Sequence, residues 1–127
     1  MPTFAELYSP LLKNDVFTFQ ARENLAHGAD GLTCALAYAE HGKPEFTLAY
    51  LLLIELSDNE KCEILAVSYE QRARISEEKA DHFDQQFHRP FPLIKLEAQK
   101  DRMAAQQVRQ GRRVRRESAT IKMLDVN

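Results

Sequence analysis

Five arginines lie close together near the end of the 127-residue chain, in the stretch RQGRRVRRES. If a helix continued past Gly111, four of these side chains would share one face, because positions three, four and seven apart lie together on an α-helix. Guanidinium groups on one face can track phosphates, with strongly salt-dependent binding. The segment lacks the interleaved aromatics that stack on single-stranded bases, so such a grip would be non-specific. The five residues are Arg109, Arg112, Arg113, Arg115 and Arg116.

The same arginine cluster has a simpler interpretation. Basic residues stabilise the C-terminus of a helix by about 0.3–1 kcal/mol through its macrodipole, and charge keeps an exposed chain end in solution. Residues 1–94 carry eight Lys and Arg against fifteen Asp and Glu, whereas residues 95–127 carry nine against four. We therefore expect the arginines to face solvent or an acidic protein surface, on this chain or on a partner, with nucleic acid as the alternative.

A second group combines carboxylates and imidazoles: Glu78, Asp81, His82, Asp84 and His88. Oxygen and imidazole ligands in this density could hold a divalent metal ion. Carboxylate-bridged di-metal bundles, however, need a Glu-x-x-His pair on each of two helices, and the chain has neither that spacing nor the duplicate. We expect a solvated acidic helix face and predict no metal and no cofactor.

Catalytic chemistry finds no other support in the chain. The two cysteines, Cys34 and Cys62, form no C-x-x-C pair and lie among apolar residues, which predicts reduced, buried thiols in place of a disulfide or zinc site. His27 and His41 each precede a glycine at a predicted helix end and have no catalytic companion. No phosphate-binding loop, nucleophile elbow or H-E-x-x-H motif occurs, so we predict no catalytic residue and a protein that is not an enzyme.

The chain that must position these residues has the composition of one folded domain, with 44% hydrophobic and 28% charged residues. Its longest apolar run, 48–54, is much shorter than the roughly 18 residues of a membrane span, so we expect a cytoplasmic protein. Every predicted element is helical. None of the segments alternates as a half-buried strand does.

The first 56 residues predict short helices around one apolar helix. Phe4, Leu7 and Tyr8 open a helical stripe that Pro10 divides, which leaves one helix or two short ones. Further helices are predicted over 16–27 and from Asp30 or Gly31 to about Gly42. The segment 44–56, PEFTLAYLLLIEL, is apolar on nearly all sides, so it should form a helix at the centre of the core.

A long helix should follow, because Ser57 and Glu60 have the spacing of a capping box. Small and apolar residues then recur in alternating steps of three and four, which favours one helix from about Asp58 to Phe87 despite a competing cap signal at Ser76. At 1.5 Å per residue it would be about 45 Å long, so part of it should protrude or pair. This helix seam comprises Cys62, Ala66, Tyr69, Ala73, Ser76, Ala80, Phe83 and Phe87.

The segment 88–92 cannot continue a helix because it contains two prolines, so the helix after it should turn back antiparallel. Leu93, Leu96, Met103, Ala104 and Val108 form its weaker apolar stripe, which fades after Met103. We expect the end of this hairpin to be the least buried part of the fold. The organisation predicted is one helical domain over 1–110, with the hairpin over 57–110, and a flexible basic tail over 111–127.

The fold class predicted is all-α: a compact helical bundle, or helix pairs packed as in tetratricopeptide repeats, with a long C-terminal antiparallel hairpin. The stretch LAYAEHG, 36–42, resembles the first helix of such a repeat, but 36–54 and 65–83 share no consistent offset and we assign no family. The function predicted is protein–protein interaction, as a small adaptor, chaperone or regulator, or as a homodimer through residues 58–110. Nucleic-acid binding through the arginine cluster is the alternative.

Overall fold

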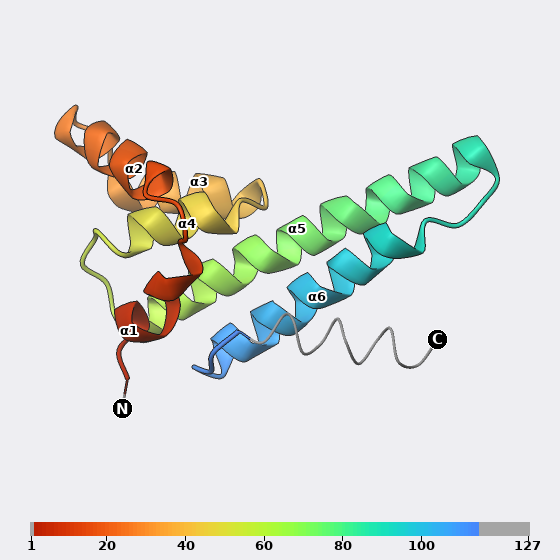
Figure 1. Cartoon of the computed structure of the whole chain (residues 1–127). Coiled ribbons are helices and arrows are strands. Elements are labelled where there is room, and N and C mark those ends of the chain that lie inside the picture. The colour runs from red at the N-terminus through yellow and green to blue at the C-terminus, as the bar shows by residue number, and fades with distance from the viewer. Residues whose placement is uncertain (1, 115–127) are drawn as a thin grey trace.

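A computed structural model describes residues 2–114, which form six α-helices and one short 3-10 helix, with no strand among them (Figure 1). The chain is therefore all-helical over this range, as the sequence predicts. No helix within 2–114 is long and apolar enough to cross a lipid bilayer. The elements are α1 (Phe4–Tyr8), η1 (Ser9–Leu11), α2 (Val16–Ala26), α3 (Gly31–Glu40), α4 (Pro44–Leu51), α5 (Asp58–Phe87) and α6 (Pro92–Arg109).

Side-chain caps and prolines define where most of these helices begin. The side chains of Thr3, Asp30 and Ser57 accept hydrogen bonds from backbone amides in the first turns of α1, α3 and α5, which would otherwise lack partners. Pro10 divides the N-terminal segment, so α1 is followed by the 3-10 turn η1. Pro44 occupies the first position of α4, where its missing amide costs nothing.

The apolar helix α4 packs against α2, α3 and α5. It ends at Leu51, so the prediction of a helix extending to residue 56 is wrong. After Leu51 the chain turns, and this turn places Ile54 over Gly31 at the start of α3, where a Cβ added to the glycine would lie 2.4 Å from an Ile54 methyl carbon. The apolar run continues past the helix because Ile54 packs on Gly31 and because Leu52 and Leu53 pack against the core.

The long helix α5 is unbroken from Asp58 to Phe87, as its repeating seam predicts. Ser76 lies inside it, so the cap signal there does not end the helix. At about 45 Å it is longer than the rest of the fold is wide. His88 ends it in the left-handed conformation, with φ of 53°, and α6 then runs back antiparallel along it (Figure 1).

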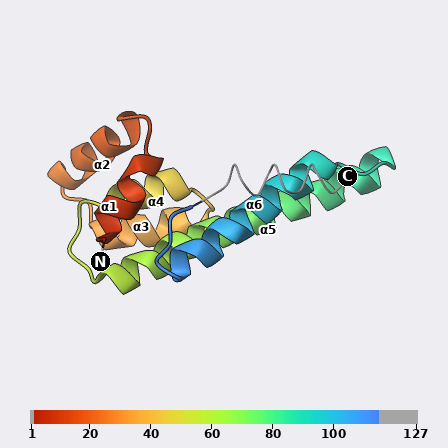
Figure 2. The ribbon, with the colours of Figure 1, turned by 60° about the horizontal axis from the view of Figure 1, so that its bottom comes forward.

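The α5–α6 hairpin extends well beyond the helices that cover its base (Figures 1 and 2). The helical cluster, residues 2–54, packs on the first half of α5 through α1, α3 and α4, and the outer half of the hairpin stands clear of it. Ala104, Ala105 and Val108 are fully buried at the base. The expectation that the hairpin is least buried after Met103 is therefore wrong, because that end of α6 packs on α5 and lies next to Tyr8 of α1. The exposed part is the tip, residues 85–93, in which all residues except the half-buried Phe91 are exposed.

Candidate interaction surfaces

Arg109, the first of the five arginines, is already paired within the molecule. Its Nε and Nη2 atoms each lie 3.0 Å from a carboxylate oxygen of Glu63, and Nη2 also donates to Glu70. The hydrogen bonds that Arg109 donates to Glu70 and then to Glu63 raise the pKa of Arg109, and the bond from Arg109 lowers the pKa of Glu63. This guanidinium therefore binds the acidic side of α5.

The predicted face of four arginines does not form, because α6 ends at Arg109. Gly111 adopts a φ of 68°, and its amide bonds to the carbonyl of Val108 at 3.0 Å. The amide of Arg112 bonds to the carbonyl of Gln107 at 2.8 Å, which completes a Schellman motif. Arg112 and Arg113 are exposed beyond this stop, and Arg115 and Arg116 lie outside the described residues.

The start of the segment predicted as a flexible tail is held against the fold. The hydroxyl of Tyr8 donates to the carbonyl of Arg112 at 2.8 Å, and the carbonyl of Val108 lies 3.5 Å away. Val114 packs against the core. Burial, followed by the proximity of Cys62, raises the pKa of Tyr8. The chain direction after α6 is thus fixed by α1 as far as Val114, and the rest of the predicted tail lies outside the described residues.

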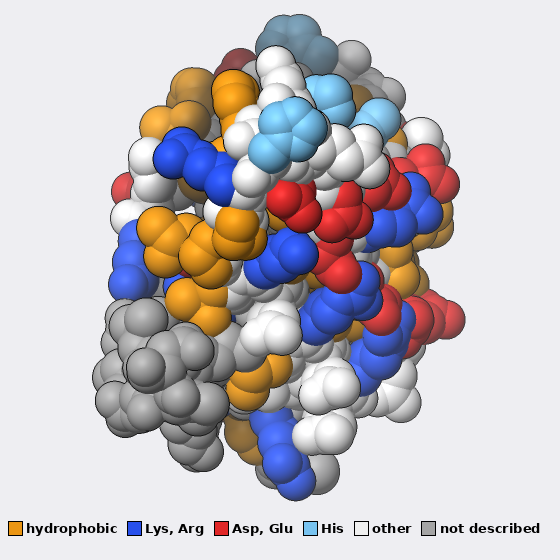
Figure 3. All heavy atoms as spheres, turned by 90° about the vertical axis from the view of Figure 1, so that its right-hand side faces the viewer, with side chains coloured by type: hydrophobic (Ala, Val, Ile, Leu, Met, Phe, Trp, Pro, Cys, Tyr) orange, Lys and Arg blue, Asp and Glu red, His pale blue; other side chains and the backbone are white. Residues whose placement is uncertain are grey.

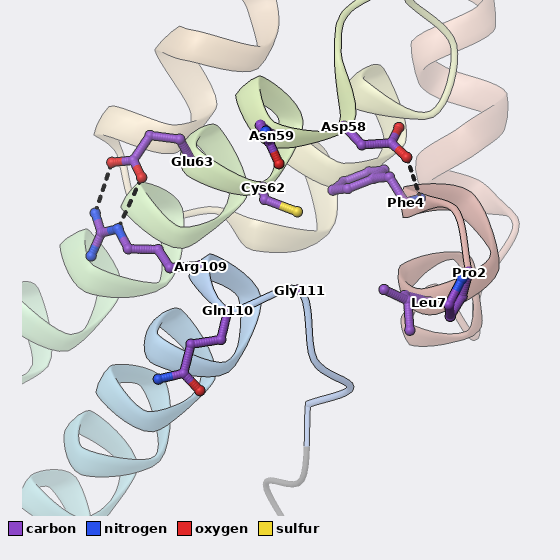
Figure 4. Close-up of a pocket in the computed structure, with 10 residues that line it drawn as sticks. All are labelled: Pro2, Phe4, Leu7, Asp58, Asn59, Cys62, Glu63, Arg109, Gln110 and Gly111. Carbon is purple, nitrogen blue, oxygen red and sulfur yellow. Dashed lines mark hydrogen bonds and ion pairs between the residues drawn. The ribbon is translucent and has the colours of Figure 1, made fainter.

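A groove of about 430 Å³ opens between α1, the start of α5 and the end of α6 (Figure 4). Phe4, Leu7 and Cys62 give it an apolar lining, and the Glu63–Arg109 pair lies along one side. Asp58 accepts a hydrogen bond from the Phe4 amide at 3.2 Å, which ties α1 to α5. Asp58 and Glu63, the carboxylates that line the groove, therefore already accept hydrogen bonds from other groups of the chain.

Both cysteines are free, but the expectation that they are buried is wrong because each is half-buried. Cys62 lines the groove, and burial of its thiol raises its pKa. A thiol whose pKa is raised is less reactive at neutral pH, since the thiolate is the nucleophile.

The helix seam of α5 is largely used inside the molecule. Ala66, Tyr69, Ala73 and Ala80 are buried, while Cys62 and Ser76 are half-buried. The last two seam positions differ: Phe83 is half-buried and Phe87 is 53% exposed. The three alanines on alternate seam positions let α6 approach closely, so the seam is closed by the hairpin itself and opens only at its outer end.

An apolar surface continues along the outer half of the hairpin. Phe83, Phe87 and Phe91 form one aromatic cluster, with ring centroids 5.4–6.0 Å apart. The Lys79 ammonium lies 5.7 Å from the Phe83 ring centre, and Ile75, one turn before Lys79, is 45% exposed. We call this surface the distal apolar face; it consists of Ile75, Lys79, Phe83 and Phe87 on α5 and Phe91 at the start of α6.

The carboxylates near the distal apolar face are paired with arginines. Glu77 accepts from Arg102 of α6, and Glu78 pairs with Arg74 at 3.7 Å. Seen end-on from the tip, hydrophobic side chains gather on the left of the molecule, while Asp and Glu gather on the right among Lys and Arg (Figure 3). Within residues 2–114, no group of three or more His, Cys, Asp and Glu side chains is placed to hold a metal ion.

One polar connection inside the hairpin has no motif in the sequence. Arg72 of α5 binds Asp101 of α6 through two hydrogen bonds of 2.9 Å and reaches Glu45 of α4 at 3.3 Å. Burial opposes the charge of Arg72, but the bonds to Asp101 and the charges of Asp101 and Glu45 raise its pKa. An aspartate one helical turn before two alanines is the only sequence signal, and it does not identify the partner.

Comparison with protein-family models, with curated protein sequences and with solved structures finds no match to this chain.

Proposed function

We propose that the chain is a non-enzymatic protein–protein interaction module, a small adaptor, chaperone or regulator, that binds its partner through the distal apolar face. The observation that supports this proposal is the exposure of Ile75 and Phe87, at 45% and 53%, on a hairpin that stands clear of the helical cluster. Contiguous exposed apolar patches on folded proteins mark interaction sites. Aromatic side chains dominate the energetics of such interfaces.

The rigidity of the hairpin also supports the proposal. The aromatic cluster joins α5 to the start of α6, and Ala80 is fully buried between the two helices. Side chains that are already ordered lose little conformational entropy when a partner binds them. The hairpin thus presents its apolar face in a fixed arrangement, at a distance from the helical cluster.

The pairing of Arg109 with Glu63 and Glu70 favours this function over nucleic-acid binding. A phosphate would have to compete with two carboxylates for that guanidinium. The other two described members of the arginine cluster, Arg112 and Arg113, are exposed. Nucleic-acid binding predicts an affinity that falls by orders of magnitude as salt rises. Replacement of both exposed arginines by glutamine should leave partner binding unchanged if the interaction uses the distal apolar face.

The proposal also includes a helix-pair arrangement of the fold and a cytoplasmic location. The packing of α3 with α4, and of both on α5, supports a helix-pair arrangement of the tetratricopeptide kind. Free cysteines in 2–114 agree with a reducing, cytoplasmic setting.

The proposal is tested by comparing partners captured by the immobilised wild-type chain with those captured by two variants. Phe87→Ser removes an exposed aromatic from the distal apolar face, and Phe19→Ser removes one that is 66% exposed on α2. Because burying one phenylalanine contributes about 1.5–3 kcal/mol, Phe87→Ser should weaken a specific partner by about tenfold or more. Phe19→Ser should retain that partner. Equal capture by all three chains, or loss with Phe19→Ser alone, would contradict the proposal.

A further inference from the structure

We infer that the partner of the distal apolar face is a second copy of this chain, packed antiparallel, so that the outer halves of two hairpins form a four-helix bundle. The inference rests on the proposed function, because it names the occupant of the same face. It predicts a closed homodimer with two-fold symmetry.

The distal apolar face continues a surface that the chain buries elsewhere. Tyr69 lies in the core, and Arg72, one turn further along α5, binds Glu45 of the helical cluster. At Gly42 the turn between α3 and α4 touches α5 so closely that an added Cβ would lie 2.8 Å from the Arg72 amide nitrogen. From Arg72 onward the helical cluster provides no cover for this side of α5.

Each uncovered side chain on α5 lies about one helical turn after the previous one, so together they form a strip that winds by about 120° around the helix. Ile75, Lys79, Phe83 and Phe87 are four residues apart, and Ile75 comes three residues after Arg72. The side of α5 that packs on α3 and α4 at the base is therefore the side that carries the apolar residues at the outer end. A partner that presents a helical surface like that of α3 and α4 would therefore bury these apolar residues.

The dimensions of the uncovered part fit a second copy. From Arg72 to Phe87 the helix rises about 22 Å, and the same length is uncovered in every copy. Two copies laid antiparallel over this length would place the distal apolar face of each against that of the other. Each hairpin tip then points toward the α3–α4 turn of the other chain.

The position of the helical cluster excludes the parallel arrangement. The cluster stands on the side of the hairpin that continues into the distal apolar face. In a dimer whose hairpins run parallel with these faces in contact, the two clusters would occupy the same space. The antiparallel arrangement places them at opposite ends of the bundle.

The chemistry of the face also suits self-association. None of its five members is acidic. Glu77 pairs with Arg102 of α6, and Glu78, which borders the face three residues after Ile75, pairs with Arg74. Two such faces can therefore meet without burying an unpaired carboxylate, which would be costly. Lys79 lies over the Phe83 ring, so its aliphatic stem can stay in the interface near the two-fold axis while its ammonium group extends away from the axis to water.

The first test is the mass of the full chain in solution, measured by sedimentation equilibrium over a concentration series. The wild-type chain should be a dimer that dissociates on dilution. Phe87→Ser should raise the dissociation constant by about tenfold or more, whereas Phe19→Ser should leave it unchanged. A wild-type chain that stays monomeric at every concentration would overturn the inference, and so would a dimer that Phe87→Ser does not weaken.

The second test determines the arrangement with single cysteines, in a chain whose Cys34 and Cys62 are replaced by alanine. Residue 79 lies near the middle of the uncovered length, next to the two-fold axis, so Lys79→Cys should form a disulfide with its own copy. Gln86→Cys should form none, because the antiparallel arrangement separates the two tips. A disulfide at residue 86 and none at residue 79 would show a tip-to-tip contact and overturn the inference.

The outcomes separate this inference from the proposed function. A monomeric chain that loses a different protein partner through Phe87→Ser would leave the interaction module standing and remove the second copy as its partner. If the wild-type chain is a dimer, if Phe87→Ser dissociates it and if Lys79→Cys links its two copies, both the proposed function and this inference are supported.

Discussion

The guanidinium of Arg72 and the carboxylate of Asp101 meet edge to edge, with two hydrogen bonds of 2.9 Å that join α5 to α6. The Asp101 side chain is 3% exposed and that of Arg72 27%. The pair lies where the helical cluster ends, because Arg72 also contacts Glu45 of α4. It therefore fixes the register of the hairpin at the point from which the outer half extends.

Removal of one partner of this pair should be costly. Asp101→Ala leaves a largely buried guanidinium without its main acceptor, so the free energy of unfolding should fall by about 2–3 kcal/mol. Arg102→Gln, which breaks the exposed pair with Glu77, is the matched control and should cost about 0.5 kcal/mol. Urea unfolding monitored by circular dichroism measures both. Equal losses for the two variants would show that the Arg72–Asp101 pair has no special part in stability.

Two glycines with similar backbone angles should respond differently to alanine. Gly42 and Gly111 have φ of 67° and 68°, so alanine is strained at both, at a cost of about 1 kcal/mol each. At Gly42 the new methyl group would also lie 2.8 Å from the backbone of Arg72, whereas nothing lies within 4 Å at Gly111. Gly42→Ala should therefore lower the melting temperature clearly more than Gly111→Ala. The same shift in both would mean that the turn does not press on α5.

Tyr8 should make the fold sensitive to alkali. Burial raises the pKa of Tyr8, and it raises the pKa of Cys62 as well, so both groups stay neutral in the folded chain when the unfolded chain has begun to ionise. Stability should be constant near neutral pH and fall as the pH rises above about 9–10, where free cysteine and tyrosine lose their protons.

Tyr8→Phe separates the two contributions of this residue. At neutral pH it should cost about 1 kcal/mol, because the carbonyl of Arg112 loses its hydrogen bond. Its stability should then decline less between neutral and alkaline pH than that of the wild-type chain. Melting temperatures measured across this range show the difference, and parallel curves for the two chains would contradict the assignment to Tyr8.

Local patterns predicted the hairpin well. The seam from Cys62 to Phe87 and the cap at Ser57 predicted the bounds of α5, and the prolines at 90 and 92 predicted the turn. Each is a signal between residues close in sequence, where helix geometry fixes the distance. The end of α4 was predicted wrongly because Leu52 and Leu53 are as apolar as the helix before them, and contacts with distant residues, Ile54 with Gly31 among them, decide where the chain turns.

The candidate surfaces were predictable only in part. The cluster at 109–116 was visible as a charge pattern, but the stop at Gly111 and the pairing of Arg109 with Glu63 depend on a glycine conformation and a partner 46 residues away. The exposure of Phe87 could not be read from the seam, because the same spacing places Tyr69 in the core. The two residues differ because the helical cluster covers α5 only as far as about Arg72. The repeating pattern of the sequence does not show where that cover ends.

The central claim is that the outer half of the hairpin is the contact surface between two copies of the chain, and hydrogen–deuterium exchange of the wild-type chain at low and high protein concentration tests it most directly. We predict that backbone amides from about residue 75 to residue 91 exchange more slowly in the concentrated sample, while those of α2, which carries the exposed Phe19, do not change. Slower exchange in α2, or identical exchange along the hairpin at both concentrations, would contradict the account.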